Sequence, residues 1–565
     1  MQVRHINIQS FRGIKSLDWQ VDGQFICLIG PGDSTKSTIL SAVDYALFPR
    51  WKLDFDDSDF YNGDTSNPFS ITVTVGGLPA ELKSDSRFGL ELRGWGSDGL
   101  HDEPQEEDDL VISIQLTVDK SLEPKWLVVN ERRPEGRPIS ANDRDSLGAV
   151  RIGDFLDRHL TWARGSILSR LTGSGEELTH LLAEISRTAR SSLSTASLPK
   201  LKAATEKLAE LSKGVGVKPH TEFAPRLDTK AVDVSAGAIS LHDGEVPIRL
   251  SGLGTRLLIT LALQKNAVSS GAVALIDEVE HGLEPHRLRR LLRTLRNEFE
   301  LPGNGSLGQL LITTHSSVVV DELPCSELRV VRCNNGAVTI HKLDDETQKT
   351  VRRSPEAFLS SGIIVCEGAT EIGLCRALDT WWMKVGDYDP LAVKGISLVD
   401  GCGLASERYV ERMASIGYST VFFGDSDRTL NPSQSALEAA GATVIIWGDS
   451  LCLEARIAKD LPWAGIQELL SLAVSILDDD KVRAGVCGQF SLDKTPLKGA
   501  IASWPEGAEL RTAIGVAAKN RDWFKNTDIG EQVGNVVTKY LPAIPKSDLA
   551  VKISALRTWI DIHVT

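Results

Sequence analysis

Two groups of residues in this chain have the types and spacing for chemistry on phosphates. Near the N-terminus, residues 30–37 (GPGDSTKS) form a glycine-rich stretch that ends in a lysine and a hydroxyl side chain. Near the C-terminus, residues 367–371 (EGATE) and 425–427 (DSD) place acids directly after apolar segments. The first pattern is typical of a loop that binds a nucleoside triphosphate, and the second of a carboxylate site for divalent cations.

The N-terminal stretch joins a predicted strand, 24–29, to a predicted helix, 36–47. In such a P-loop, backbone N–H groups surround the phosphates, the lysine reaches the terminal phosphates and a hydroxyl binds Mg²⁺. Thr35 stands where the usual pattern has glycine, and because a Cβ limits φ, we expect a slightly rearranged loop. The residues expected to hold the nucleotide here are Gly30, Gly32, Lys36, Ser37 and Thr38.

A second apolar segment, 272–276, ends in two acids, Asp277 and Glu278. We expect Asp277 to hold the Mg²⁺ shell and Glu278 to orient or activate the attacking water. About 240 residues separate Lys36 from Asp277, far more than a compact mononucleotide fold needs. This separation predicts a split ATPase head with insertions.

Three further segments give a resemblance to the ABC-type heads of the SMC-like ATPases. They are 250–256 (LSGLGTR), 282–286 (GLEPH) and 313–316 (TTHS). The resemblance implies that Ser251, with Gly252, caps the γ-phosphate of ATP bound by a partner protomer, and that His315 senses the phosphate in its own site. A core histidine with satisfied hydrogen bonds is the alternative for His315. Arg12, in a turn after the first predicted strand, would approach the nucleotide.

The C-terminal acids follow segments that alternate strand and helix character. Predicted strands at 362–366, 394–399, 420–424 and 443–447 favour a parallel sheet, whose ligands bind at the carboxyl ends of the strands. Carboxylates that converge there repel one another unless divalent cations neutralise them. Oxygen ligands select Mg²⁺ or Mn²⁺ over zinc, and two such ions can cleave a phosphodiester.

This arrangement resembles the Toprim domain. Its combination with an N-terminal ABC-type head is similar to the OLD (overcoming lysogenization defect) family of ATP-dependent endonucleases, which includes the nuclease subunit of the Gabija anti-phage system. The resemblance implies a lysine that contacts the scissile phosphate, for which Lys525 is preferred and Lys519 is the alternative. The metal ligands that it implies are Glu367, Glu371, Asp425, Asp427 and Glu454.

The expected fold class is α/β, with a split ABC/SMC-like ATPase head and a Toprim domain. We expect an N-terminal ATPase lobe at 1–154, a helical insert at 155–225 that could form a dimer surface, a C-terminal ATPase lobe at 226–350, and the Toprim nuclease domain at 351–565. Further strands are predicted at 2–9, 70–76, 88–93, 110–118 and 309–314, and a hairpin turn at Asn335-Gly336.

The leading hypothesis is a DNA endonuclease regulated by ATP, in defence against phage. DNA is the expected partner, together with a second copy of the chain or a higher homo-oligomer, and a helicase is a further candidate. One alternative is an SMC-like ATPase that clamps DNA in repair without cutting it. A topoisomerase- or primase-like Toprim enzyme is a third hypothesis, disfavoured because no zinc-binding cysteines or tyrosine-bearing cleavage domain is recognisable.

Composition limits the class of protein. A length of 565 residues favours two to four domains, and 42% hydrophobic with 24% charged residues is ordinary for globular domains. The sequence opens on a strand pattern without a leader, has no apolar run of about 20 residues, and scatters its eight cysteines without a CxxC pair. A cytoplasmic protein with no membrane partner is expected.

Charge gives one more observation. A net charge of −14 argues against indiscriminate coating of nucleic acid, although a local binding surface is compatible with it. The most basic stretch is a predicted helix at 287–296 with arginines along one side. Both a solvated face and a phosphate-facing ridge are consistent with this stretch.

Overall fold

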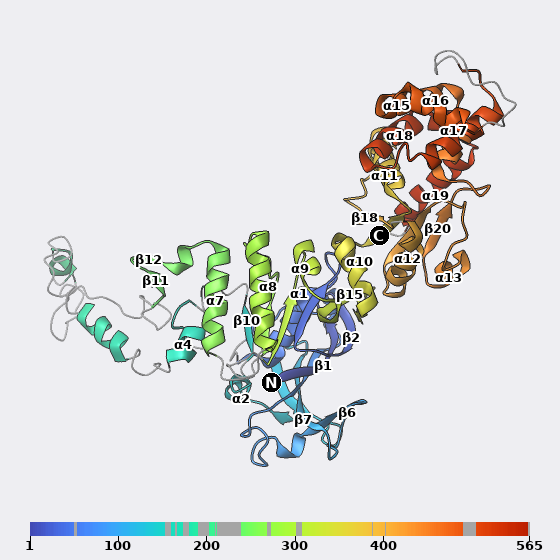
Figure 1. Cartoon of the computed structure of the whole chain (residues 1–565). Helices are drawn as coiled ribbons and strands as arrows, with labels where there is room; N and C mark the ends of the chain where they lie inside the picture. Colours follow the sequence, from blue (N-terminus) through green and yellow to red (C-terminus); the bar gives the residue numbers. More distant parts are fainter. Residues whose placement is uncertain are drawn as a thin grey trace. The chain divides into compact units, whose positions relative to one another are not determined.

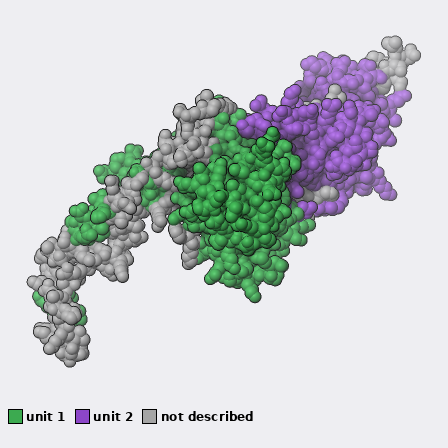
Figure 2. Space-filling view, turned by 90° about the horizontal axis from the view of Figure 1, so that it is seen from below, with its two compact units in different colours: residues 1–27, 37–314, 335–337 green, residues 28–36, 315–334, 338–565 purple. Residues whose placement is uncertain are grey.

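The computed structural model describes residues 1–49, 53–147, 149–152, 157, 160–163, 166–172, 180–189, 203–208, 211, 239–267, 273–300, 308–386, 388–401, 403–489 and 504–562. The chain divides into two compact units, shown in Figure 2. Unit 1 comprises residues 1–27, 37–314 and 335–337, and unit 2 comprises residues 28–36, 315–334 and 338–565. The fold is mixed α/β, as the alternating pattern predicts.

Within the described ranges, fourteen strands form one large mixed sheet (Figure 1). Its order is β10-β13-β14-β3-β15-β16-β2-β1-β4-β7-β5-β6, with β8 beside β7 and β9 beside β8. The strands are β1 (Gln2–Phe11), β2 (Ile14–Gln20), β3 (Phe25–Ile29), β4 (Phe69–Gly76), β5 (Arg93–Gly96), β6 (Gly99–His101), β7 (Asp109–Val118), β8 (Pro124–Val129), β9 (Arg137–Pro138), β10 (Val150–Ile152), β13 (Val273–Ile276), β14 (Gln309–Thr313), β15 (Leu328–Asn334) and β16 (Ala337–Lys342).

The two parts of this sheet follow different sequence rules. β10, β13 and β14 are parallel, and every residue of β13 and β14 is buried, as is typical of strands covered on both faces. β1, β2, β4 and β7 are antiparallel, and the alternation along β2 puts one face of the strand outward. Ile276 pairs with Ile312, so the residues after β13 and β14 emerge at the same edge.

The helices of unit 1 include α1 (Lys36–Leu47), α2 (Ala141–Asp145), α4 (Ile167–Thr172), α7 (Leu253–Ala267) and α8 (Pro285–Glu300), with α1 opening at Lys36 as predicted. The helical insert expected at 155–225 is helical at 167–172, 180–189 and 203–208. Other positions of that expectation, Leu178 and Leu201 among them, lie outside the described residues.

One strand prediction was wrong and one turn prediction is confirmed. Residues 88–92 form no strand and only Arg93 belongs to β5, because Gly89–Glu91 is a 3₁₀ turn that buries the Glu91 carboxylate, which accepts from Arg133 at 2.9 Å. The apolar alternation there reflects burial of a turn. At the hairpin between β15 and β16, Asn335 and Gly336 have φ values of 48° and 79°, the left-handed geometry that Asn-Gly favours.

Unit 2 contains, among its described residues, a four-stranded parallel sheet in the order β18-β17-β19-β20. The strands are β17 (Gly362–Cys366), β18 (Ile396–Asp400), β19 (Ser419–Gly424) and β20 (Thr443–Ile446), which confirms the four predicted positions. The helices include α9 (Ser317–Glu322), α10 (Gln348–Arg353), α11 (Ala369–Gly386), α12 (Ser406–Ser415), α13 (Gln434–Ala439), α14 (Leu453–Asp460), α15 (Trp463–Leu477), α16 (Asp479–Cys487), α17 (Ala508–Asn520), α18 (Thr527–Tyr540) and α19 (Asp548–Ile562).

Close packing of α11 against α18 fixes the helix that follows β17. A Cβ at Gly373 would lie 2.4 Å from the backbone N of Glu531, and a Cβ at Gly530 would lie 2.8 Å from the carbonyl oxygen of Thr370. Only glycine allows the two backbones to approach so closely. Helix α18 therefore holds the first turn of α11 in place.

Within the described part of the chain, no helix combines the length and apolar character needed to cross a membrane.

Candidate nucleotide site and carboxylate centre

The loop between β3 and α1 has the backbone geometry of a phosphate-binding turn. Gly30 has a φ of 141°, and a Cβ there would lie 2.6 Å from the carbonyl oxygen of Val331, so only glycine fits. Thr35 has a φ of 67°, the left-handed conformation that glycine adopts without steric cost. The loop thus keeps a glycine-like path at Thr35 at the cost of backbone strain.

The ammonium group of Lys36 lies inside this loop. The side chain is 3% exposed, and Nζ donates to the carbonyl oxygens of Gly30 at 3.1 Å and Pro31 at 2.7 Å and to Ser34 Oγ at 3.1 Å. The loop therefore positions its cation by its own oxygens. Gly32 has open space around the position of a Cβ.

Asp277 is the centre of a polar cluster after β13. Its Oδ1 accepts from Ser37 Oγ at 2.8 Å and from Thr313 Oγ1 at 2.6 Å, and its Oδ2 accepts from Arg151 Nη2 at 3.1 Å. The predicted Mg²⁺ hydroxyl, Ser37, and the predicted Mg²⁺ acid, Asp277, are thus in direct contact. Thr38 follows in the first turn of α1.

The sequence did not indicate Arg151, because a lone arginine in the middle of a three-residue strand has no motif around it. The side chain is 8% exposed, and Nη1 donates to Ser41 Oγ at 3.0 Å and lies 3.7 Å from Asp44 Oδ2. Arg151 therefore ties Asp277 to α1.

Glu278 differs from its neighbour in exposure. It has a φ of 47°, its N–H donates to Thr313 Oγ1 at 2.8 Å, and its side chain is 50% exposed. Strained conformations of this kind are frequent at functional sites. The carboxylate is accessible to water, as a residue that orients an attacking water requires.

The remaining predicted nucleotide residues are dispersed. Arg12 donates to Asp59 Oδ1 at 2.8 Å and to the Tyr45 hydroxyl on α1 at 3.2 Å. Ser251 and Gly252 lie between a 3₁₀ turn and α7, and no described contact brings them to Asp277. His315 is exposed and lies two residues after the end of β14. Separation from Asp277 is expected for Ser251 and Gly252, which the resemblance assigns to the nucleotide of a partner protomer, whereas the roles predicted for Arg12 and His315 stay predictions.

In unit 2 the carboxyl ends of β17 and β19 bring acids together. Glu367 follows β17, and its Oε2 accepts from the N–H of Asp425, the residue after β19, at 2.9 Å. Glu371 lies in the first turn of α11, where its Oε2 accepts from the Gly368 N–H at 3.0 Å. Adjacent parallel strands thus unite two motifs that are 58 residues apart.

Among the described residues, the acids of this centre outnumber the cations that pair with them, Arg428 and Lys519. Burial, and then the neighbouring Glu371 and Glu367 carboxylates, raise the pKa of Asp425 to about 9. Burial also raises the pKa of Glu371 to about 8, with Glu454 as the next cause. Carboxyl groups in this environment ionise together only when cations neutralise them, so the donor set fits divalent cations.

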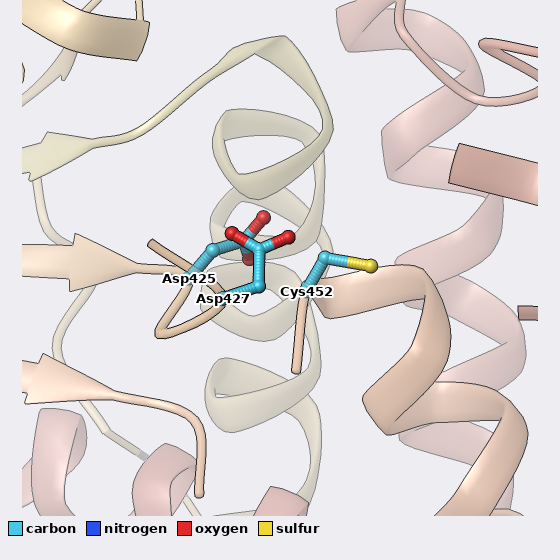
Figure 3. Close-up of side chains that lie close together, drawn as sticks. All are labelled: Asp425, Asp427 and Cys452. Atoms are coloured by element: carbon cyan, nitrogen blue, oxygen red, sulfur yellow. The ribbon is translucent and has the colours of Figure 1, made fainter. Parts of the chain in front are cut away.

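Ligand atoms of Asp425, Asp427 and Cys452 lie within 4.8 Å of one another (Figure 3). Burial, and then the nearby Glu454, raise the pKa of the Cys452 thiol to about 12, so the thiol is protonated at neutral pH. Only a thiolate is an effective soft-metal ligand. The carboxylate oxygens, which suit Mg²⁺ or Mn²⁺, are therefore the effective donors.

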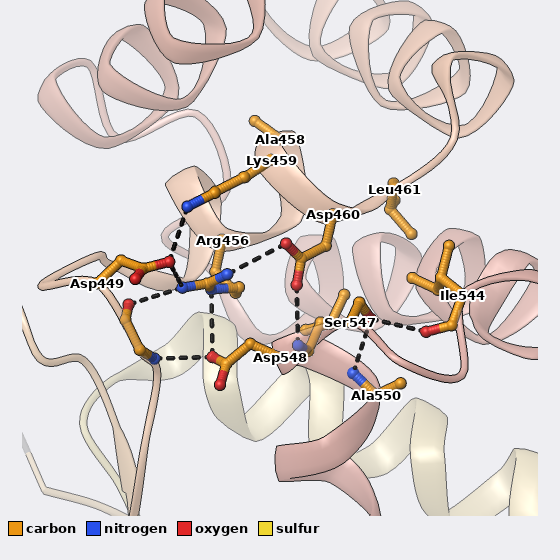
Figure 4. A network of polar contacts seen from close by, with 12 residues as sticks. Asp449, Arg456, Ala458, Lys459, Asp460, Leu461, Ile544, Ser547, Asp548 and Ala550 are labelled. Atoms are coloured by element: carbon orange, nitrogen blue, oxygen red, sulfur yellow. Dashed lines mark hydrogen bonds and ion pairs between the residues drawn. The ribbon is translucent and has the colours of Figure 1, made fainter. Parts of the chain in front are cut away.

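Helix α14 adds Glu454, which is 9% exposed, in its first turn. The Leu453 N–H donates to Asp425 Oδ1 at 2.8 Å, so the start of α14 abuts the centre. Arg456, 2% exposed, anchors the helix by contacts with Asp449 at 2.9 Å, Asp460 at 3.1 Å and Asp548 at 3.3 Å (Figure 4).

The two candidate lysines occupy different positions. Lys519, at the end of α17, forms an ion pair with Asp427, and this hydrogen bond raises the pKa of the lysine. Lys525 is 58% exposed and pairs with Asp522 at 2.7 Å. The geometry favours Lys519, the alternative of the sequence-based interpretation.

The sequence analysis did not identify two residues of the carboxylate centre, Arg428 and Glu407. Arg428 Nε donates to Glu367 Oε1 at 3.1 Å, and Nη1 donates to Glu407 Oε1 at 2.5 Å. Glu407, on α12, is fully buried. Arg428 directly follows the DSD motif, which is a usable signal, whereas Glu407 belongs to a helix without a recognisable motif.

The large α/β sheet, the phosphate-binding loop and the acid after β13 define the first part of the chain as a P-loop ATPase domain. Residues 25–321 match the AAA_21 family, described as "AAA domain, putative AbiEii toxin, Type IV TA system". This match spans more than half of the 565 residues, and the chain belongs to this family. Nucleotide binding with Mg²⁺ follows from this assignment.

Two solved structures were also found to be similar. A Smc head bound to the C-terminal winged-helix domain of ScpA shares 14% identity at a TM-score of 0.35 and covers 62% of this chain and 100% of its own. The SMC head domain from Thermotoga maritima shares 13% identity at a TM-score of 0.29, over 61% and 100%. Scores this low carry no argument about this protein. No curated protein sequence matches the chain significantly.

Proposed function

We propose that this protein is an ATP-regulated, divalent-metal-dependent DNA endonuclease of the OLD type, with a Toprim centre in unit 2. The observation that carries the proposal is the group of acids at the carboxyl edge of the four-stranded parallel sheet. Burial and mutual repulsion raise the pKa of Asp425 to about 9, which is the electrostatic character of a site built for cations. Anti-phage defence is the biological role that the family resemblance suggests.

The chain's own residues have distinct parts in the proposed reaction. Arg428 orients Glu367 by the hydrogen bond at 3.1 Å, and Lys519 offers an ammonium group for an oxygen of the scissile phosphate, with Lys525 as the alternative. Bound cations would supply an activated water and stabilise the leaving oxygen. The residues proposed to hold Mg²⁺ or Mn²⁺ are Glu367, Glu371, Asp425, Asp427 and Glu454.

For the ATPase domain we propose that Ser37 and Asp277 hold the Mg²⁺ of ATP and that Glu278 orients the attacking water. Ser251, Gly252 and His315 would act in a homodimer with ATP between two heads. Such a closed pair is a two-state element, and coupling of this kind changes activity about 5- to 150-fold. We therefore propose that the cleavage rate responds to the nucleotide.

The test is nicking of supercoiled plasmid by purified protein, with Mg²⁺ or Mn²⁺ and with or without ATP. The Asp425→Ala variant should lose nicking, whereas Asp479→Ala, which removes an exposed acid of unit 2 paired with Arg483, should nick like the wild type. Equal nicking by Asp425→Ala and the wild type would place the nuclease centre elsewhere.

The second candidate function is an SMC-like ATPase that clamps DNA in repair without cutting it. The family match supports this candidate, because it covers residues 25–321, the ATPase part of the chain, and does not extend to the acids of unit 2. ATP-dependent retention of circular DNA, with no nicking under any metal condition, would support it over the nuclease.

A further inference from the structure

Helix α8 of unit 1 has two contrasting faces. Its leucines Leu288, Leu291, Leu292 and Leu295 are each at most 7% exposed and form the packed face. Between residues 285 and 297 the helix carries five arginines and no acid, in a chain whose net charge is −14. The basic character is therefore local to this helix.

A hollow runs along the other face of α8. The described residues that line it are His286, Arg289, Arg290, Arg293, Thr294 and Asn297. They follow the i, i+3, i+4, i+7 spacing of a single helical stripe, about 17 Å long at 1.5 Å per residue. Arg290 and Arg293 are exposed, and Arg289 is half-buried.

A merely solvated helix has little reason to keep this pattern. Arg289 and Arg293 are four residues apart and Arg290 and Arg293 are three apart, and like charges at these spacings destabilise a helix. Solvated helices usually mix opposite charges along one face. The described residues that line the stripe include three arginines and no acid, so the stripe carries a local excess of positive charge.

We infer that this stripe of α8, residues 286, 289, 290, 293, 294 and 297, binds the backbone phosphates of duplex DNA. Guanidinium groups bind phosphate oxygens in bidentate geometry and remain charged at every physiological pH. A stripe about 17 Å long can contact several phosphates, because successive phosphates of one strand rise about 3.4 Å along the duplex axis. Such contacts position DNA without reading its sequence.

The inference rests on the proposed function only in taking DNA as the ligand. Its test measures binding, not cleavage, so the Asp425→Ala background is used throughout. Fluorescence anisotropy would follow a labelled 30-base-pair duplex at several salt concentrations. Arg290→Gln/Arg293→Gln should weaken binding about 10- to 100-fold at 0.15 M salt and lower the slope of log K against log salt by about 2.

The matched control is Arg87→Gln/Arg287→Gln, which removes the same charge from unit 1. Arg87 pairs with Asp143 at 3.2 Å, and Arg287, on α8 itself, pairs at 3.2 Å with Glu284, which precedes the helix. The control should bind DNA within about twofold of the background protein. Arg290→Lys/Arg293→Lys should keep the salt slope, since both charges remain.

Unchanged DNA affinity in Arg290→Gln/Arg293→Gln would overturn the inference, as would an equal loss in the matched control. It would also be overturned if the variant bound DNA normally but lost self-association in sedimentation, because the stripe would then contact a second copy of the chain. Plasmid nicking by protein that retains Asp425 tests the nuclease proposal separately. The DNA-binding inference and the nuclease proposal can therefore fail independently.

Discussion

Asp277 and Asp425 occupy similar positions in their local sequences but lie in opposite electrostatic environments. Each aspartate directly follows a buried parallel strand, β13 or β19. Asp277 accepts hydrogen bonds from Ser37 and Thr313 and forms an ion pair with Arg151. The carboxyl group of Asp425 is surrounded by other acids, and its pKa rises to about 9.

The difference shows that an acid after a strand does not by itself define a metal centre. In unit 1 the protein supplies donors and a cation around the aspartate, so this cluster is electrostatically satisfied by its own chain. In unit 2 the acids outnumber the nearby cations, so the centre depends on added cations to ionise. The predictions below test whether the two sites differ in this way.

The largest expected effect concerns the nucleotide site. Lys36→Ala should weaken ATP binding at least about 100-fold, because the loop holds this ammonium group among its own oxygens and the phosphates lose their cation. Glu278→Gln should bind ATP like the wild type and slow hydrolysis. Equilibrium binding of labelled ATP and phosphate release measure the two effects. Equal ATP affinity in the wild type and Lys36→Ala would contradict the assignment of residues 30–37 as the ATP-binding loop.

The next effect separates the two lysines near the carboxylate centre. Lys519→Met should slow plasmid nicking about 100-fold, because it removes the cation that contacts Asp427. Lys525→Met, which loses only an exposed pair with Asp522, should change the rate by less than about threefold. Initial nicking rates at saturating Mg²⁺ provide the comparison. A larger loss of rate in Lys525→Met than in Lys519→Met would favour Lys525 as the residue that contacts the scissile phosphate.

A smaller effect is expected for the residue that orients Glu367. Arg428→Gln should lower the nicking rate about 10-fold and raise the Mg²⁺ concentration for half-maximal rate, since Glu367 loses its partner and Glu407 is left buried without its guanidinium. Arg483→Gln is the control, because its partner Asp479 is exposed. An unchanged Mg²⁺ dependence would show that Arg428 has a structural role only.

The smallest effect is on stability without metal. The ordinary pKa of Asp425 is 3.8 and its folded value is about 9, so the folded chain keeps a proton that the unfolded chain loses. The free energy of unfolding should therefore fall as the pH rises from about 4 to about 9 in EDTA. Asp425→Asn should flatten this dependence and raise the melting temperature at pH 8 by about 2–4 °C.

Excess Mg²⁺ should reverse the trend in the wild type, because cations favour the ionised acids. Calorimetry across this pH range measures both effects. A flat metal-free profile for the wild type would mean that the acids of unit 2 are already satisfied, and the contrast with Asp277 would disappear.

Much of the architecture could be predicted from local patterns. The helix at 36–47 and the strands at 362–366 and 443–446 lie where apolar periodicity places them. The strand predicted at 88–93 failed because a buried 3₁₀ turn around Glu91 produces a similar pattern over a few residues. Periodicity reports burial, and short segments do not distinguish a strand from a buried turn.

The sequence by itself determined which acids, glycines and lysines were candidates, because their spacing next to apolar strands is local information. Only the tertiary structure decided their partners. Arg151 contacts Asp277, 126 residues away in the sequence, and Lys519 contacts Asp427, 92 residues away. Glu407 accepts a hydrogen bond from Arg428, and no motif marks this acid in the sequence. Such contacts depend on strand order and helix packing, and the pKa of a carboxyl group follows from the neighbours that this packing provides.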